Sequence, residues 1–307
     1  MPQYNEYTID TILTELSIAY SNAELIGEKI FPRLGVKSRT GYFYKFDKSK
    51  FRIEDDRRTG VSRANRVDYG MTKVAFGPLY EHSLEEAIEY EVRDTYPTAH
   101  DARVDATENV DERLSLGHEK AVADILTDTA VITQNTTLSG TSQWSDFANS
   151  DPFTDIQTAA DTIQSGAMVT ANTAILGYQV WSKIKHHPDL LGRLSVATVR
   201  VLTEDLFAAL IGVETVHVAK AMYNGADEGQ ADSMSYVWGK HFVLAYVSPT
   251  PGIKKMSLGY TLFLMKGRLV DRWDEPAVKA EFVRVTDYYE PKLVAAEAAY
   301  LVKNAVA

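Results

Sequence analysis

Residues 98–128 predict the longest helix of this 307-residue chain. Thr98, with Asp101 three residues later, is typical of a helix N-terminus, because both side chains can accept hydrogen bonds from free backbone donors. At about 1.5 Å per residue the helix is roughly 45 Å long, several turns longer than an ordinary domain helix. Its apolar stripe is strong only in the second half, so we expect the first half to bury little. Gly117 predicts a bend or the close approach of another backbone. The alternative for the whole segment is an ordinary surface helix with a solvated charged face.

Composition excludes several classes of protein. The apolar content of 45% and charged content of 24% are those of a soluble globular protein. The absence of cysteine excludes disulfides, thiolate metal sites and a cysteine nucleophile. No apolar run is long enough to span a membrane, and residues 1–4 begin neither a secretory signal nor a basic targeting peptide. We therefore expect a soluble intracellular product without membrane contact.

Charge is distributed unevenly along the chain. The net charge of -10 argues against a dedicated DNA- or RNA-binding protein, which needs a basic face. Residues 36–73 nevertheless contain 11 Lys/Arg and 5 Asp/Glu, a local charge of +6, whereas residues 81–128 contain 14 acidic and 4 basic residues, a local charge of -10. The two segments either fold against each other or meet their complements on a neighbouring copy.

Catalytic and metal-binding patterns do not emerge from the sequence. The seven histidines form no metal-ligand spacing, and there is no phosphate loop, nucleophile elbow or dinucleotide fingerprint. Glu81, Glu85 and Glu89 share one face in either a strand or a helix, and such close like charges favour a solvated or partner-facing edge over a catalytic site. We predict a structural or interaction protein, not an enzyme, with no cofactor and no metal.

The remaining chain alternates helices and strands. Residues 10–20 predict a short amphipathic helix in an N-terminal arm, and residues 36–77 predict a projecting β-hairpin with a charged tip. Helices are predicted at 152–165, 178–186 and 203–212, and strands at 173–177, 214–219, 236–247, 257–265 and 277–289, the last two joined through Trp273–Pro276. Residues 292–306 resist assignment. This order is typical of an α+β or α/β domain.

One stretch carries a family resemblance. Thr173 to Leu191 reads TAILGYQVWSKIKHHPDLL, a strand followed by a helix. Together with the order of arm, basic hairpin, acidic segment, long helix and returning strand pair, it resembles the major capsid protein of tailed double-stranded DNA bacteriophages, the Hong Kong 97 type of shell fold. The resemblance in layout covers nearly the whole chain and implies an α+β fold.

The resemblance implies a division into four parts. Residues 1–35 would be the N-terminal arm and 36–77 the extended loop. Residues 78–165 and 254–290 would form the peripheral domain with its long spine helix. Residues 166–253 and 291–307 would form the axial domain.

The resemblance also implies hexamers and pentamers that close an icosahedral shell around double-stranded DNA. The basic loop would then lie over the acidic face of the adjacent subunit. The basic set comprises Lys45, Lys48, Lys50, Arg52, Arg57, Arg58, Arg63 and Arg66. The acidic set comprises Glu81, Glu85, Glu86, Glu89, Glu91, Asp101, Asp105 and Glu108.

Other partners follow from the same resemblance. We expect a separate scaffold protein, a portal, decoration proteins and weakly held DNA, in a virion capsid assembled in the host cytoplasm. Some family members join subunits by a lysine–asparagine bond, but no matching asparagine and glutamate are identified here. An encapsulin-type shell around protein cargo is the first alternative, and an enzyme with an acidic site is the second.

Overall fold

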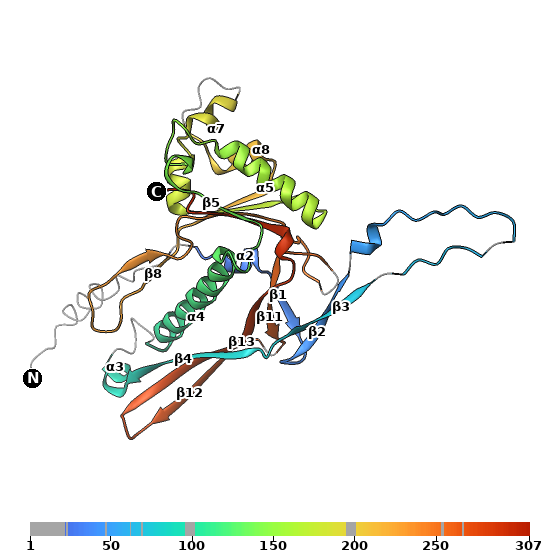
Figure 1. Cartoon of the computed structure of the whole chain (residues 1–307). Helices are drawn as coiled ribbons and strands as arrows, with labels where there is room; N and C mark the ends of the chain where they lie inside the picture. The colour runs from blue at the N-terminus through green and yellow to red at the C-terminus, as the bar shows by residue number, and fades with distance from the viewer. Residues whose placement is uncertain are drawn as a thin grey trace, which may run out of the picture.

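The computed structural model describes residues 22, 24–46, 48–61, 63–68, 70–95, 102–194, 201–252, 255–265 and 267–307. The arm helix predicted at 10–20 and the capping residues Thr98 and Asp101 lie outside these residues. Figure 1 shows two sheets with a long helix between them and a hairpin that projects from one side. The mixture of helices and sheets confirms the α+β class.

The first sheet contains five strands in the order β1-β11-β13-β12, with β4 paired to the other side of β13. Their bounds are β1 (Arg33–Val36), β4 (Tyr80–Glu89), β11 (Gly259–Leu264), β12 (Leu269–Glu275) and β13 (Ala280–Leu293). β1 runs parallel to β11, and the other pairs are antiparallel. The strands predicted at 257–265 and 277–289 are confirmed. The expected connection through Trp273 is wrong, because Trp273 to Glu275 belong to β12.

The second sheet contains five strands in the order β5-β14-β10-β6-β7. Their bounds are β5 (Asn135–Thr137), β14 (Ala299–Lys303), β10 (Phe242–Ala245), β6 (Thr173–Gly177) and β7 (Thr215–Ala219). β6 and β10 are buried at every residue, which explains their continuous apolar sequences. The predictions of β6 and β7 are confirmed. The strand expected over 236–247 is shorter than predicted, because the chain turns at Gly239 before β10.

The helices begin and end largely where capping residues predict. Their bounds are α2 (Gly27–Ile30), α3 (Tyr90–Thr95), α4 (Ala102–Thr127), α5 (Pro152–Ala167), α6 (Tyr178–Ile184), α7 (Pro188–Arg193) and α8 (Glu204–Ile211), with 3-10 turns η1 (Lys48–Phe51), η2 (Gly140–Ser142) and η3 (Ala296–Ala298). The Thr203 hydroxyl accepts a hydrogen bond from the Leu206 N–H at 3.4 Å, and Gly212 takes the left-handed conformation that ends α8.

Helix α4 packs against both sheets. Near its start, Val110 and Leu114 pack with Val285 of β13, and near its end, Val122 and Leu126 join the core under β10 and β14. The first half therefore buries more than predicted. The close backbone approach expected at Gly117 is wrong, because a Cβ there would meet no atom within 4 Å. The helix positions one sheet relative to the other.

The largest core lies between the second sheet and helices α5, α6 and α8. Ile156 and Ile163 of α5 pack there with Leu176 and Leu244 of the sheet, and β5 pairs in parallel with β14. The expected peripheral range 78–165 includes both β5 and α5. Their contacts instead group them with the second sheet.

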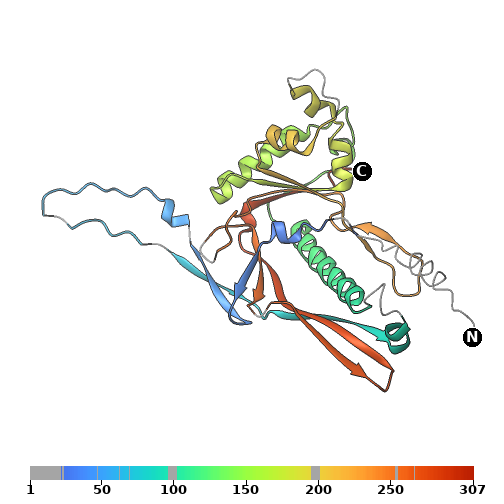
Figure 2. The ribbon, with the colours of Figure 1, turned by 180° about the vertical axis from the view of Figure 1, so that it is seen from behind.

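Two hairpins extend from this body. β2 (Gly41–Phe46) pairs with β3 (Met71–Phe76), and β8 (Met222–Asn224) pairs with β9 (Met234–Tyr236). Figure 2 shows the chain between β2 and β3 as a long loop that projects away from the rest of the molecule. The projecting hairpin predicted at 36–77 is confirmed.

Candidate assembly interface

The projecting loop exposes apolar side chains almost completely. Ile53 is 97% exposed, Val61 102% and Val67 74%. The two sides of the loop are linked near its tip, where the Asn65 Nδ2 group donates to the Asp55 carbonyl at 2.7 Å. Full burial of one such side chain contributes about 1.5–3 kcal/mol of favourable free energy, so a partner that covered the loop would be bound favourably.

The predicted basic residues follow this loop. Lys45 lies on β2, Lys48 and Lys50 lie on η1, and the five arginines Arg52, Arg57, Arg58, Arg63 and Arg66 lie along the extended segment. All are exposed except Lys50, whose side chain is not described. Lys48 pairs with Glu297 of its own chain at 3.5 Å. The loop thus presents a basic and apolar surface.

Strand β4 presents a row of acidic residues. Glu81, Glu85 and Glu89 alternate along the strand and are exposed, which confirms that they share one face. The Glu81 carboxylate accepts a hydrogen bond from the Tyr288 hydroxyl at 2.7 Å. Glu85 lies opposite Arg284 in the register of β4 and β13. We call the face of β4, β13 and β12 that carries these three glutamates the outer face.

The outer face also carries aromatic rings. Trp273 of β12 and Phe282 of β13 stack with centroids 5.5 Å apart, and the Arg284 guanidinium lies 5.0 Å from the Trp273 ring centroid. Arg284 pairs with Asp271 at 3.1 Å. An acidic rim around aromatic residues is suited to a basic and apolar partner.

The other predicted acidic residues are distributed differently. Glu86 points to the opposite side of the sheet, where its carboxylate accepts a hydrogen bond from Asn109 of α4. Glu86 therefore does not lie on the same face as Glu81, although both were assigned to the acidic set. Glu91 on α3, and Asp105 and Glu108 on α4, are exposed but belong to helices rather than to the outer face. Asp101 lies outside the described residues.

The basic loop and the acidic strand lie apart within one chain. Both views show the loop beyond η1 extending away from β4, α3 and α4 (Figure 1, Figure 2). The loop beyond η1 therefore does not fold against the acidic strand of its own chain. Only the start of the basic segment comes near it among the contacts described, where the Arg39 guanidinium lies 4.4 Å from the centroid of the Tyr288 ring.

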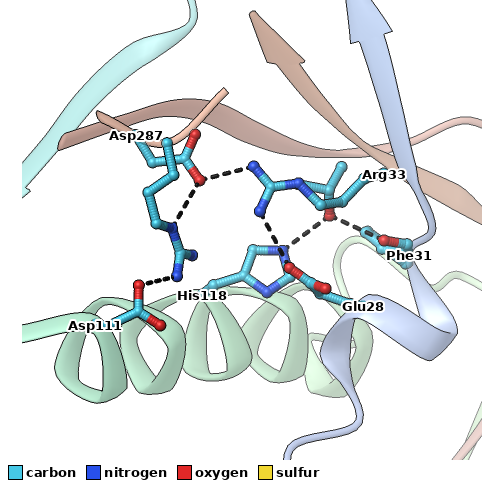
Figure 3. A network of polar contacts seen from close by, with 8 residues as sticks. Glu28, Phe31, Arg33, Asp111, His118 and Asp287 are labelled. Carbon is cyan, nitrogen blue, oxygen red and sulfur yellow. Dashed lines mark hydrogen bonds and ion pairs between the residues drawn. The ribbon is translucent and has the colours of Figure 1, made fainter. Parts of the chain in front are cut away.

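A polar network centred on the buried Asp287 attaches the base of the arm to the body (Figure 3). The Asp287 carboxylate on β13 pairs with Arg33 of β1 at 2.7 Å and with Arg268 at 3.4 Å. Arg33 also pairs with Glu28 of α2 at 3.1 Å, and Arg268 pairs with Asp111 of α4. Burial is the largest single influence on the pKa of Arg33 and lowers it. The hydrogen bond to Asp287 and the negative charges of Asp287 and Glu28 together outweigh burial, so the pKa is raised.

His118 of α4 extends this network. Its Nε2 atom lies 2.8 Å from the Thr261 hydroxyl, which donates its single proton to the Phe31 carbonyl at 3.0 Å (Figure 3). His118 Nε2 must therefore carry a hydrogen and donate it. Burial lowers the pKa of His118 to about 4, so the ring is neutral at pH 7.

Glu119, the next residue of α4, is a second attachment point. It is 1% exposed and accepts hydrogen bonds from the backbone N–H groups of Ile26, at 3.0 Å, and Gly27. Its other oxygen accepts from the Trp238 indole at 2.6 Å. Burial raises the pKa of Glu119, against these hydrogen bonds. A Cβ at Gly27 would lie 2.8 Å from a carboxylate oxygen of Glu119, so a larger residue there requires the carboxylate to shift.

Sequence analysis did not identify these attachment residues. Glu119 looks like any other acid of a charged helix, and Asp287 lies in a strand that also contains partly exposed polar residues such as Arg284 and Glu290. The apolar residues around Glu119, from Ala121 to Leu126, were the available signal, because an acid inside a buried stripe needs partners.

No metal site or membrane span is found in the described part of the chain. Groups of three or more His, Asp or Glu side chains suited to a metal ion are absent among the described residues. None of the helices described is both long and apolar enough to cross a bilayer.

Comparison with known proteins decides the family. No protein-family model matches the chain. The major capsid protein of Burkholderia phage BcepMu is 32% identical over 306 residues, which cover 96% of each chain. The chain belongs to the phage major capsid protein family. This capsid protein is a structural subunit of the phage head, located in the virion capsid, and it is not an enzyme.

Solved structures agree with this assignment. The crystal structure of a phage-related protein from Bordetella bronchiseptica RB50 is 27% identical to the capsid protein, with a TM-score of 0.75 over 96% of this chain and 97% of that one. An encapsulin complex from Synechococcus elongatus PCC 7942 has a TM-score of 0.54 at 12% identity over 96% and 95% of the two chains, which shows the shared fold alone. The resemblance to the Hong Kong 97 type of shell fold is confirmed.

Proposed function

We propose that the capsid protein assembles as hexamers and pentamers into an icosahedral head around double-stranded DNA. In this proposal the loop between β2 and β3 of one subunit lies over the outer face of the adjacent subunit. The observation that carries it is the nearly complete exposure of Ile53 and Val61 at the end of a projecting hairpin. Large exposed apolar side chains on an extended segment mark a surface that a partner covers.

Apolar burial and charge have different roles in this contact. Each exposed ion pair is worth ~0–1 kcal/mol, whereas each buried Ile or Val side chain is worth about 1.5–3 kcal/mol. Apolar burial would supply most of the affinity, and the arginines facing Glu81, Glu85 and Glu89 would fix the register and speed association. Because loop and outer face are different surfaces, the contact is heterologous and propagates around a ring.

We propose the following division of the chain. The arm (1–35) and the extended loop (36–77) stay as predicted. The peripheral domain comprises 78–131 and 255–293, and the axial domain 132–252 and 294–307. The division follows sheet membership, because β5 pairs with β14 and α5 packs on the second sheet.

Further partners belong to the same proposal. The net charge of -10 supports DNA that is enclosed but weakly held, since phosphate binding requires a basic surface. A separate scaffold, a portal and decoration proteins are proposed on the resemblance to the capsid family.

Charge reversal in the loop tests the contact. We expect Arg57→Glu with Arg58→Glu to prevent shell formation, measured by sedimentation and negative-stain microscopy, while thermal unfolding of the unassembled subunit is unchanged. Adding Glu81→Lys and Glu85→Lys should restore part of the assembly if the two surfaces meet. Normal shells from the loop variant would refute the charge-complement contact.

Particle content separates the two kinds of shell. A phage head encloses DNA, whereas an encapsulin-type shell encloses protein. We expect nuclease-protected DNA in native particles, measured by the ratio of absorbance at 260 and 280 nm after nuclease treatment. Protein cargo without DNA would favour the encapsulin alternative.

A further inference from the structure

An apolar groove lies at the base of the projecting hairpin. It has a volume of about 740 Å³, within the roughly 300–1,000 Å³ range of clefts that bury a small-molecule ligand. Its walls come from β1, β2, β3, β11 and the end of α5, and include Val36, Tyr42, Phe76, Met168, Leu262 and Met265. Tyr42 is 66% exposed, Met265 64% and Met168 44%. Exposed methionines adapt to varied apolar partners.

The rim of the groove is basic. Five lysines contribute to its lining, namely Lys37, Lys45, Lys48, Lys255 and Lys292. Glu297 is the acid among the lining residues that the structure describes, and it pairs with Lys48. The chemistry of the groove therefore suits an acidic segment with a continuous apolar face.

The sequence before Asn22 has this chemistry. Residues 1–21 contain Glu6, Asp10 and Glu15 but no Lys, Arg or His, which gives a local charge of -3. Apolar residues recur with helical spacing at Ile9, Ile12, Leu13, Leu16 and Tyr20. On a helix Asp10 and Glu15 flank this stripe on opposite sides, where lysines on both rims of a groove can meet them.

The chain leaves the body far from its own groove. The Asn22 side chain donates to the Met222 carbonyl at 2.9 Å and accepts from the Met222 N–H at 3.2 Å, which fixes this point beside β8. Both views place β8 and the β2–β3 hairpin on opposite sides of the molecule (Figure 1, Figure 2). A segment that starts at β8 is better placed to reach another copy than to return across its own subunit.

We propose that the acidic, amphipathic segment 9–20 of one subunit docks in the lysine-rimmed groove of a neighbouring subunit. The inference rests on the proposed self-assembly and adds to it a defined socket for the arm. Occupation covers the exposed side chains of Tyr42, Met168 and Met265. It also links the arm of one copy to the base of the hairpin from which the loop of another copy extends.

The absence of cysteine makes disulfide mapping a direct test. Chains carrying Leu16→Cys are mixed with chains carrying Met265→Cys, assembled and oxidised, and linked peptides are identified by mass spectrometry. We expect the 16–265 disulfide between copies to form at least tenfold more than a 16–278 disulfide from the matched control Val278→Cys. Val278 is 57% exposed, similar to Met265, but lies at the turn between β12 and β13. Equal yields from the two mixtures would overturn the proposal.

Dilution identifies which copy supplies the arm. A chain carrying both Leu16→Cys and Met265→Cys is assembled with a tenfold excess of the unsubstituted chain. We expect the covalent link within one chain to remain absent and the link between copies to fall with dilution. A link within one chain that survives dilution would show that the groove holds its own arm, and would overturn the proposal.

Charge reversal at the rim gives an independent readout. We expect Lys255→Glu with Lys292→Glu to lower the yield of the 16–265 disulfide by about tenfold, since each exposed pair contributes modestly, and Asp10→Lys with Glu15→Lys to restore it. An unchanged yield would contradict the role of the lysines. Micrographs of the same samples separate the two claims: shells without the disulfide overturn this inference alone, whereas failure of the unsubstituted chain to form shells overturns the proposed function and the inference with it.

Discussion

The base of the arm packs into the body of the subunit, whereas the loop of the hairpin projects away from it. Ile30 and Phe31 at the arm base are 0% exposed, and Glu119 and Asp287 hold the neighbouring backbone and Arg33. Ile53 in the loop is 97% exposed. The arm base is thus stabilised within the subunit, whereas the loop leaves apolar side chains uncovered that the proposed contact with a neighbouring subunit would bury.

The largest effect on subunit stability is expected at Glu119. Replacement by alanine leaves three buried donors, the N–H groups of Ile26 and Gly27 and the Trp238 indole, without their acceptor. Each unsatisfied donor costs about 1–3 kcal/mol, so we expect Glu119→Ala to lower the free energy of unfolding by about 4 kcal/mol. Urea denaturation of the unassembled subunit measures the loss.

A matched acid on the same helix sharpens this result. Glu112 is exposed on α4, and we expect Glu112→Ala to change the free energy of unfolding by less than about 0.5 kcal/mol. Equal losses from Glu119→Ala and Glu112→Ala would break the view that the arm base is fastened at Glu119.

A somewhat smaller effect should follow acidification, through His118. Burial is the main cause that lowers its pKa to about 4; Glu28 and Asp287 favour the charged ring, while Arg33 and Arg268 oppose it. The unfolded chain, with a histidine pKa near 6.5, therefore binds more protons between pH 6.5 and 4. Stability is present above pH 6.5 and falls by about 3 kcal/mol as the pH drops to 4.

Replacement of His118 isolates its share of the pH dependence from that of other histidines. Gln at this position keeps an N–H donor for Thr261 but does not titrate. We expect the loss of unfolding free energy between pH 7 and pH 4 to be about 3 kcal/mol smaller in His118→Gln than in the unsubstituted chain. The same slope in both proteins would mean that burial does not hold His118 neutral.

The smallest effect is expected from the loop itself. Ile53→Ala should change the free energy of unfolding by less than about 0.5 kcal/mol, because the side chain has almost no contacts to lose. The matched change Ile30→Ala in the arm base should cost roughly 2–5 kcal/mol. Chemical denaturation of the two variants compares the regions directly. A large loss of unfolding free energy in Ile53→Ala would show that the loop packs within its own subunit.

Local patterns predicted the parts of this fold that depend on neighbours in sequence. The cap at Thr203 and Gly212, the alternation of Glu81, Glu85 and Glu89, and the projecting hairpin all arise from short-range geometry. The acidic set that the resemblance implied also included Glu86, which strand alternation turns toward Asn109 of α4.

Other elements are defined by distant partners. β14 lies between β5 and β10 in the second sheet. Hydrophobic cores on both sides of this sheet bury its two faces, so it lacks the alternation that marks a half-exposed strand. β12 is largely polar and is a strand because β13 pairs with it. The acceptors of the Ile26 and Gly27 N–H groups lie 93 and 92 residues away, beyond any local signal.

The position of Glu119 on α4 has a mechanical consequence. The carboxylate joins the arm to the helix beyond Leu114, which packs on the first sheet, and before Val122, which packs under the second. In the proposed assembly, a pull on the arm from a neighbouring copy would therefore reach α4 between its contacts with the two sheets. The arm would thus load the helix that positions one sheet relative to the other.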